Sequence, residues 1–153
     1  MQALELKFPP PVVALLVAAA MWGISLVASA VEVPVFIRVV AAIAIALIGV
    51  GIAISGAVAF RRAKTTINPL KPELTSSLVT SGIYRFSRNP MYLGLAFVLL
   101  AWAVFMSSLW ALLGPVVFIL YISRFQVTPE ERVLSGMFGA AYSAYQTKVR
   151  RWL

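Results

Sequence analysis

The sequence contains no cysteine, no histidine and no aspartate among its 153 residues. Without cysteine, the chain has no disulfide bond, no thiolate metal site and no cysteine nucleophile. Without histidine, it lacks the commonest general base and the commonest metal ligand. We expect no metal site built from the acidic side chains that remain, which are Glu5, Glu32, Glu73, Glu130 and Glu131.

Charged residues of either sign are also scarce. They make up 12% of the chain, against about 25% in an average soluble domain, while 61% of the residues are hydrophobic. The mean hydropathy of +0.93 places the chain in the membrane class. We attribute the net charge of +8 to the flanks of membrane helices and to anionic membrane lipids, and we expect no nucleic-acid partner.

Long apolar runs predict an all-α integral membrane protein with about four transmembrane helices in one membrane domain over residues 1–153. Pro9, Pro10 and Pro11 predict an extended lead-in before the first helix. Ser107 and Ser108 divide the second half of the apolar sequence, so the last two spans are expected to form a helical hairpin. The expected spans are residues 12–31, 35–60, 91–106 and 109–123.

Two polar segments complete the chain, a central loop over residues 61–90 and a tail over residues 124–153. The tail predicts an amphipathic helix, lying on the membrane or folded back over the loop. Thr128 and Glu131 fit a capping box that would begin this helix. The apolar face of the helix recurs at steps of three or four residues: Leu134, Phe138, Ala141, Tyr145, Val149 and Trp152.

Basic residues predict the orientation in the membrane. Of the 13 Lys and Arg residues, one precedes the first span, six lie in residues 61–90 and five in residues 124–153. Placing both termini and the loop in the cytoplasm leaves Arg38 alone on the other side, as the positive-inside rule requires. The loop and the tail then face one compartment and can form one site.

The stretch Leu78–Gly94 concentrates arginines, aromatic residues and turn residues in a chain with few polar groups. Asn89 followed by Pro90 is a good helix start. From the pattern alone, ordinary interpretations stay open: interfacial aromatic residues for Tyr84 and Tyr92, and lipid-phosphate contacts for the arginines.

This stretch resembles the cofactor motif of the isoprenylcysteine carboxyl methyltransferase family and its bacterial relatives, and phospholipid N-methyltransferases share a more distant version. Thr66–Pro72 resembles the lead-in of the bacterial branch. The resemblance covers roughly residues 64–153. A second motif also matches: Pro129-Glu130-Glu131, Leu134, Phe138-Gly139, Tyr142, Tyr145 and Val149-Arg150-Arg151.

The resemblance implies an enzyme of the prokaryotic inner membrane that uses S-adenosylmethionine, releases S-adenosylhomocysteine and methylates a lipophilic acceptor entering from the bilayer. It implies catalytic roles for Arg88, Glu130 and Glu131. The residues that it implies line the cofactor are Tyr84, Arg85, Arg88, Asn89, Pro90, Tyr92, Leu93, Gly94, Glu130, Glu131, Tyr142, Tyr145 and Arg150.

The chemistry of these residues suits such a cofactor. Arginine can clamp its carboxylate, glutamate can accept hydrogen bonds from its ammonium or ribose, and tyrosine can stack on adenine or face the sulfonium. Many family members have histidine where this chain has Asn89, and asparagine cannot act as a general base. Because methyl transfer is a direct displacement that depends on alignment, we expect activity to survive this difference.

Two other functions stay open at this point, a small four-helix membrane transporter and a non-catalytic membrane partner. A transporter usually needs an ionisable group within a span, and Arg38 is the only one here. Neither the acceptor's nucleophile, whether carboxylate, amine or thiol, nor the oligomeric state follows from the sequence.

Overall fold

The computed structural model describes residues 4–66 and 68–153 of the chain. Its main elements are α1 (Pro10–Val27), α2 (Val35–Arg62), α3 (Pro90–Met106), α4 (Leu113–Ile122) and α5 (Thr128–Lys148). Short helical turns join them: η2 (Pro72–Leu74), η3 (Gly82–Arg85), η4 (Trp110–Leu112) and the π-helical η5 (Ser123–Val127). The described residues contain 74% helix and no strand, which confirms the all-α prediction.

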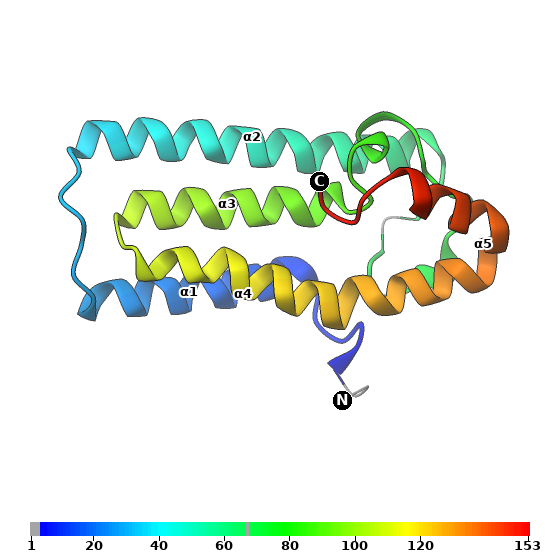
Figure 1. Ribbon diagram of the computed structural model, residues 1–153, viewed down its shortest axis with the longest axis horizontal. Coiled ribbons are helices and arrows are strands. Elements are labelled where there is room, and N and C mark those ends of the chain that lie inside the picture. Colours follow the sequence, from blue (N-terminus) through cyan, green and yellow to red (C-terminus); the bar gives the residue numbers. More distant parts are fainter. Residues whose placement is uncertain (1–3, 67) are drawn as a thin grey trace.

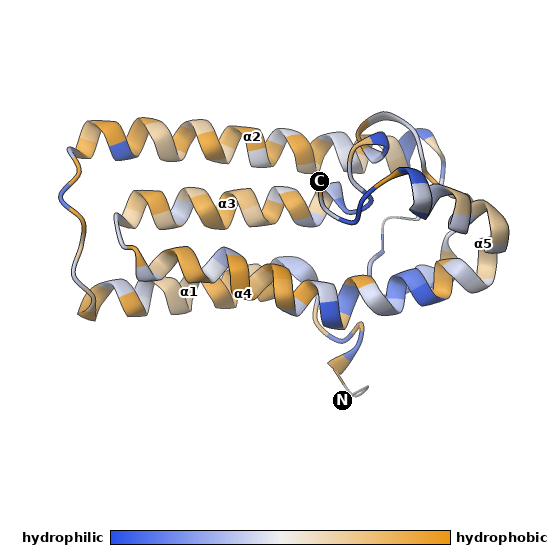
Figure 2. Ribbon diagram, viewed as in Figure 1, coloured by the Kyte–Doolittle hydropathy of each residue, from blue (hydrophilic) through white to orange (hydrophobic). Residues whose placement is uncertain are grey.

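Three helical stretches are long and apolar enough to cross a membrane: α1, α2 and the continuous run from Trp110 to Lys148. Helix α3 is also apolar but shorter. In Figure 1, α3 lies between α2 on one side and α1 and α4 on the other, while the loop and α5 gather at one end. Figure 2 shows the same division in hydropathy, with apolar spans and a hydrophilic end.

Helix α1 begins earlier and ends earlier than predicted. It starts at Pro10, because a proline in the first turn needs no hydrogen-bond acceptor for its nitrogen. It ends at Val27 because residues 28–34 form an extended linker tied to the α3–α4 turn. In that tie, the Val31 N–H donates to the Ser107 carbonyl at 2.7 Å, and the Ser107 hydroxyl donates to the Val31 carbonyl at 2.7 Å.

Small residues bring α2 and α3 together. A methyl group added to Gly49 would lie 2.7 Å from the Gly94 carbonyl oxygen, and one added to Gly94 would lie 2.5 Å from the Gly49 carbonyl oxygen. Close backbone approach of this kind is how helices pack in lipid, where apolar side chains gain little from association. Most other side chains of α2 are exposed on the outside of the bundle, since only 11% of the most apolar 18-residue stretch of this helix is buried.

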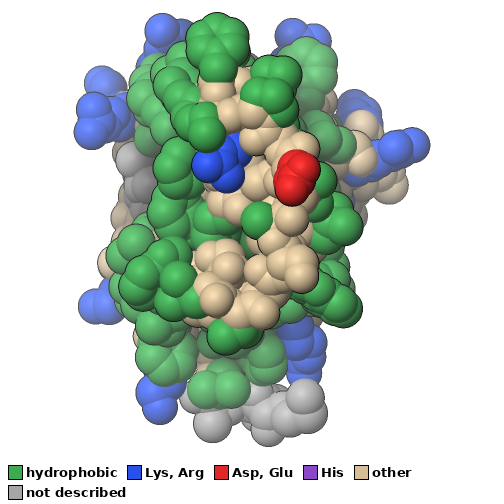
Figure 3. Space-filling view, turned by 90° about the vertical axis from the view of Figure 1, so that its left-hand side faces the viewer, with side chains coloured by type: hydrophobic (Ala, Val, Ile, Leu, Met, Phe, Trp, Pro, Cys, Tyr) green, Lys and Arg blue, Asp and Glu red, His purple; other side chains and the backbone are tan. Residues whose placement is uncertain are grey.

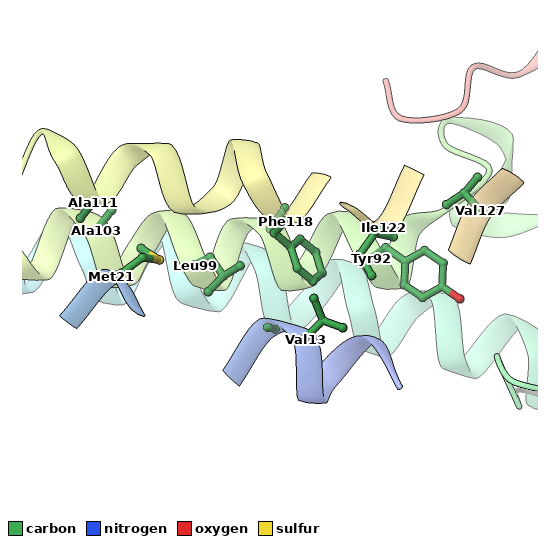
Figure 4. Close-up of a cluster of buried hydrophobic side chains, with 11 residues drawn as sticks. Val13, Met21, Tyr92, Leu99, Ala103, Ala111, Phe118, Ile122 and Val127 are labelled. Atoms are coloured by element: carbon green, nitrogen blue, oxygen red, sulfur yellow. The ribbon is translucent and has the colours of Figure 1, made fainter. Parts of the chain in front are cut away.

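A hydrophobic core joins α1, α3 and α4 (Figure 4). Phe118 and Ile122 of α4 are fully buried, and Met21 and Leu99 are each 2% exposed. The Met21 thioether fills the space beside Gly114, where any side chain would collide with it. This core holds α4 parallel to the bundle, and so it sets where the following residues leave the membrane region.

The predicted capping box at Thr128 is wrong. Helix α4 continues through the π-helical η5 into α5, so no helix begins at Thr128 and no N-terminal N–H group needs its hydroxyl. The hydroxyl instead donates to the Ser123 carbonyl at 2.7 Å. The helix is broken later, at Gly139, whose φ of 46° and ψ of −121° suit glycine.

The break at Gly139 turns the end of the chain back over the loop (Figure 1). Tyr142, Tyr145 and Val149 form a buried cluster there, against which Leu78 of the loop also packs. Of the two predicted placements for the amphipathic tail, the structure shows the one that covers the loop. The N-terminal segment joins the same end, since the Leu6 N–H donates to the Phe125 carbonyl at 3.0 Å.

Candidate functional site

The two ends of the bundle differ in chemistry. Figure 3 looks onto the end with the 28–34 linker, where hydrophobic side chains surround backbone and uncharged polar side chains. Basic and acidic side chains are seen near the middle of this face, and other Lys and Arg side chains project at its margin. The opposite end holds a cleft between the central loop, α3 and α5. Its walls include loop residues, aromatic residues and both glutamates of α5: Phe60, Thr66, Asn68, Pro69, Pro72, Thr75, Ser77, Leu78, Val79, Tyr84, Arg88, Asn89, Met91, Tyr92, Glu130, Glu131, Leu134, Tyr142 and Tyr145.

Tyr84 anchors the loop wall of the cleft. It is 5% exposed, and its ring meets that of Phe60 edge-on with 5.4 Å between centroids. The Tyr145 hydroxyl donates to the Tyr84 carbonyl at 2.6 Å, which fastens the end of α5 to η3. Burial raises the pKa of Tyr84, so its hydroxyl stays protonated in the physiological range and can donate a hydrogen bond.

Glu131 is clamped between two arginines. Arg88 Nη2 lies 2.8 Å from Glu131 Oε1, and Arg151 Nη2 lies 2.5 Å from Glu131 Oε2. The Arg88 guanidinium also donates to two backbone carbonyls at the end of α5, at 3.1 and 3.2 Å. The cluster therefore joins the loop, α5 and the C-terminal segment, and most of its hydrogen-bonding capacity is used within the protein.

Glu130 is held differently. Its Oε1 accepts a hydrogen bond from the Tyr92 hydroxyl at 2.5 Å and another from Gln126 Nε2 at 2.6 Å. Its Oε2 receives no hydrogen bond from the described part of the chain. Since a carboxylate oxygen can accept two hydrogen bonds, Glu130 keeps capacity for a ligand in the cleft.

Asn89 precedes α3, but its side chain does not cap the helix. Its Nδ2 instead donates to the Arg151 carbonyl at 2.9 Å, and its backbone N–H donates to the Ser87 hydroxyl at 3.1 Å. A second backbone tie lies next to it, where the Arg88 N–H donates to the Arg150 carbonyl at 3.0 Å. Asn89 thus fastens the C-terminal segment beside the cleft while also lining it.

The structure brings most of the residues implied by the motifs to this cleft. The lining includes Tyr84, Arg88, Asn89, Tyr92, Glu130, Glu131, Tyr142 and Tyr145. It does not include Arg85 or Arg150, which are exposed, or Pro90 and Leu93, which are buried in α3. Gly94 faces Gly49 of α2, so the backbone that comes close to it belongs to the neighbouring helix.

Two contributors were not among the site residues that the sequence analysis named, Gln126 and Arg151. Gln126 bonds to Glu130, and its position four residues before that glutamate places the two on one helix face. That spacing was visible in the sequence, but it points to a contact only if the helix continues through residue 128. Arg151 was part of the second motif, yet nothing in its spacing from Glu131 indicated an ion pair across a kinked helix.

The donor set of the cleft fits the cofactor implied by the motif resemblance. One carboxylate has capacity left, an asparagine amide and several phenols can exchange hydrogen bonds, and aromatic faces are available for a purine or a cation. Among the described residues, no group of three or more acidic, cysteine or histidine side chains could hold a metal ion. The charged, amide and aromatic side chains of the walls suit an organic ligand with both charged and aromatic parts.

Comparison with known proteins gives the family. The family model described as phospholipid methyltransferase matches residues 37–141, which include nearly all of α2, the loop, α3, α4 and the first part of α5. The chain belongs to this family. A relative from Haemophilus influenzae, described as an uncharacterized protein, is 48% identical over 63 residues, which is 41% of this chain and all of that protein. No solved structure matches the chain.

Membership in this family makes the protein a membrane methyltransferase. That activity accounts for a polar cleft at one end of an apolar bundle, which neither a transporter nor a non-catalytic partner requires. The apolar helices indicate an integral membrane protein, and a methyltransferase in a membrane would interact with lipids or lipophilic substrates.

Proposed function

We propose that the protein transfers a methyl group from S-adenosylmethionine to a lipophilic acceptor at the polar end of the bundle. The observation that carries the proposal is the cleft in which Glu130 keeps an oxygen for a ligand beside Tyr84, Tyr142 and Asn89. S-adenosylmethionine supplies an electrophilic methyl group on a sulfonium. The protein has to bind it, align it with the acceptor and limit the access of water.

The cleft residues divide this work. Glu130 accepts hydrogen bonds from the ammonium or the ribose, and the tyrosines provide aromatic faces for the purine or the sulfonium. Arg88 and Glu131 hold the wall together through their ion pair. Arg88 Nε, which is buried without a hydrogen-bond partner in the described residues, is one donor that remains for the cofactor carboxylate. Asn89 contributes an amide at the position where many members of the family that the motif resembles have histidine.

The acceptor reaches the cleft from the bilayer in this proposal, because the cleft lies at the ends of α2 and α3, where Phe60, Met91 and Tyr92 line it. Its nucleophile is a carboxylate, an amine or a thiol. The Glu130 carboxylate can act as the general base that takes a proton from an amine or a thiol, while a carboxylate acceptor needs no base. Action on a carboxyl group, the substrate for which the isoprenylcysteine carboxyl methyltransferase family is named, is the narrower version of the proposal.

Titration calorimetry tests the cofactor site directly. Detergent-purified protein is expected to bind S-adenosylhomocysteine, and the Glu130→Gln variant, which keeps the shape but loses the charge, is expected to bind it at least about tenfold more weakly. Glu73→Gln is the matched control, since Glu73 is exposed in η2 and lies outside the cleft. Folded protein that binds no S-adenosylhomocysteine would overturn the proposed cofactor.

We also propose that both termini and the loop face the cytoplasm of a prokaryotic inner membrane. All basic residues except Arg38 lie in these segments, and the positive-inside rule places such segments in the cytoplasm. The absence of cysteine makes the test simple. In intact cells, a membrane-impermeant maleimide should label Ser29→Cys in the 28–34 linker and should label Ser76→Cys in the loop only after permeabilisation. The reverse pattern would invert the proposed orientation.

A further inference from the structure

Gln126 is a buried amide that touches both walls of the cleft. It belongs to η5, and 2% of its surface is exposed. Its Nε2 lies 2.6 Å from the Pro69 carbonyl oxygen and 2.6 Å from Glu130 Oε1. Because both neighbours only accept hydrogen bonds, they use both protons of the amide and fix its orientation. A single side chain thus joins the central loop to α5.

The geometry of η5 supports this link. Single π-helical turns are rare inside α-helices and occur often at functional sites, where they redirect side chains. Here the π-helical turn carries Gln126 one turn before Glu130, and the Tyr92 hydroxyl approaches the same carboxylate oxygen from α3 at 2.5 Å. With two donors on Oε1, rotation of the Glu130 carboxylate is restricted, and Oε2 is the oxygen that remains for a ligand.

We propose that Gln126 is a positioning residue for ligand binding, because its two hydrogen bonds hold Glu130 and the Pro69 segment at a set separation across the cleft. The identity of the ligand rests on the proposed function, whereas the link between the walls rests on the two distances alone. Loss of the amide frees the carboxylate to rotate and frees the loop to move. Affinity for the ligand then falls although the protein still folds.

Gln126→Met tests the proposal, because it keeps the length and much of the volume of the side chain and removes both donors. Calorimetric titration with S-adenosylhomocysteine is expected to show at least about tenfold weaker binding by folded, monodisperse variant. Gln146→Met is the matched control, since its side chain makes no hydrogen bond among the described residues, and it is expected to bind within about twofold of wild type. Equal affinity for Gln126→Met and wild type would overturn the proposal.

A double-mutant cycle separates positioning from a general loss of stability. If Gln126 acts through Glu130, adding Gln126→Met to a Glu130→Ala variant should cause little further loss of affinity. A loss of the same size in both backgrounds would overturn the positioning role. Gln126→Asn guards against misfolding of the methionine variant, because it keeps an amide but is too short to span both acceptors, and it should also weaken binding.

Hydrogen exchange tests, without any ligand, whether Gln126 joins the Pro69 segment of the loop to α5. Backbone amides of residues 68–79 are expected to exchange faster in Gln126→Met than in wild type or Gln146→Met. Unchanged exchange would show that Gln126 does not hold this segment and would overturn the proposal. If wild-type protein binds no S-adenosylhomocysteine, the proposed function fails, and the exchange result still decides whether Gln126 joins the two walls.

Discussion

The apolar bundle and the polar end of this protein are held together by different means. In the bundle, contacts depend on shape: Gly49 against Gly94, and Met21 against Gly114. At the polar end, irregular backbone from the loop and the C-terminal segment meets, and its carbonyl groups need donors. Arg88, Asn89, Gln126 and Tyr145 supply them.

This difference between packing in the bundle and hydrogen bonding at the polar end predicts where a substitution is tolerated. Helices form the hydrogen bonds of their own backbone groups, so side chains in the bundle only have to pack well. The irregular backbone at the polar end cannot satisfy its own groups in this way, and each donor side chain there joins its own segment to a carbonyl of another. We therefore expect single substitutions to be more damaging at the polar end than at most positions in the bundle.

The largest effect is expected for Arg88→Ala. The change leaves Glu131 with one arginine and removes the donor from two carbonyls, so it should cost on the order of 3 kcal/mol. Thermal unfolding in detergent and hydrogen exchange over residues 140–153 would measure it. Arg62→Ala, an exposed change in the last turn of α2, is the control. A variant as stable as this control would remove the contrast between the two ends.

A smaller but clear effect is expected within the bundle for Gly49→Val. The new side chain would collide with α3 and force the helices apart, which costs about 1–3 kcal/mol in a packed interior. Gly51→Val, two residues along the same helix, meets nothing within 4 Å and should change stability by less than about 0.5 kcal/mol. Thermal unfolding of the two variants side by side measures the difference, and equal unfolding temperatures would contradict the α2–α3 contact.

Tyr145→Phe should have an intermediate effect at the polar end. It removes one buried hydrogen bond to the Tyr84 carbonyl and should cost about 1 kcal/mol. The expected signature is faster hydrogen exchange in residues 82–86 together with a lower unfolding temperature. Tyr121→Phe serves as control, because the Tyr121 hydroxyl makes no hydrogen bond among the described residues. Unaltered exchange at η3 would mean that Tyr145 does not hold the loop.

The smallest effect is expected for Arg85→Ala. Arg85 is exposed and outside the cleft, so affinity for S-adenosylhomocysteine should stay within about twofold of wild type by calorimetry. Arg85 stands three residues before Arg88 in the same motif, which makes this variant a sharp test of the comparison. A tenfold loss would place Arg85 at the ligand, as the motif resemblance implies, and would enlarge the site beyond the cleft.

Much of the fold was predictable because the membrane restricts what an apolar chain can do. Runs of apolar residues had to become helices, and the turn predicted at Ser107 and Ser108 is present, with Ser107 in the left-handed conformation at a φ of 53°. The prediction failed at Thr128, where local capping signals suggested a helix start. The packing of Phe118 and Ile122 against the bundle keeps the helix continuous there.

The candidate site was partly predictable for a similar reason. Tyr84, Arg88 and Asn89 are close in sequence, and the motif resemblance joined them to Glu130 and Glu131 across the last spans. Arg151 and Gln126 could not be assigned roles, because their contacts depend on the kink at Gly139 and on the π-helical turn of η5. Neither feature has a local sequence signal strong enough to predict it.

By itself, the sequence determined that this is a helical membrane protein with most of its charge at one end, because hydrophobic length and basic residues act locally on how each segment meets lipid and water. It also carried the motifs that mark the family. Only the tertiary structure decided which polar groups meet: Glu131 between two arginines, and Glu130 between Tyr92 and Gln126. Hydrogen bonds and ion pairs depend on distances of about 3 Å between residues far apart in sequence, and packing alone sets those distances.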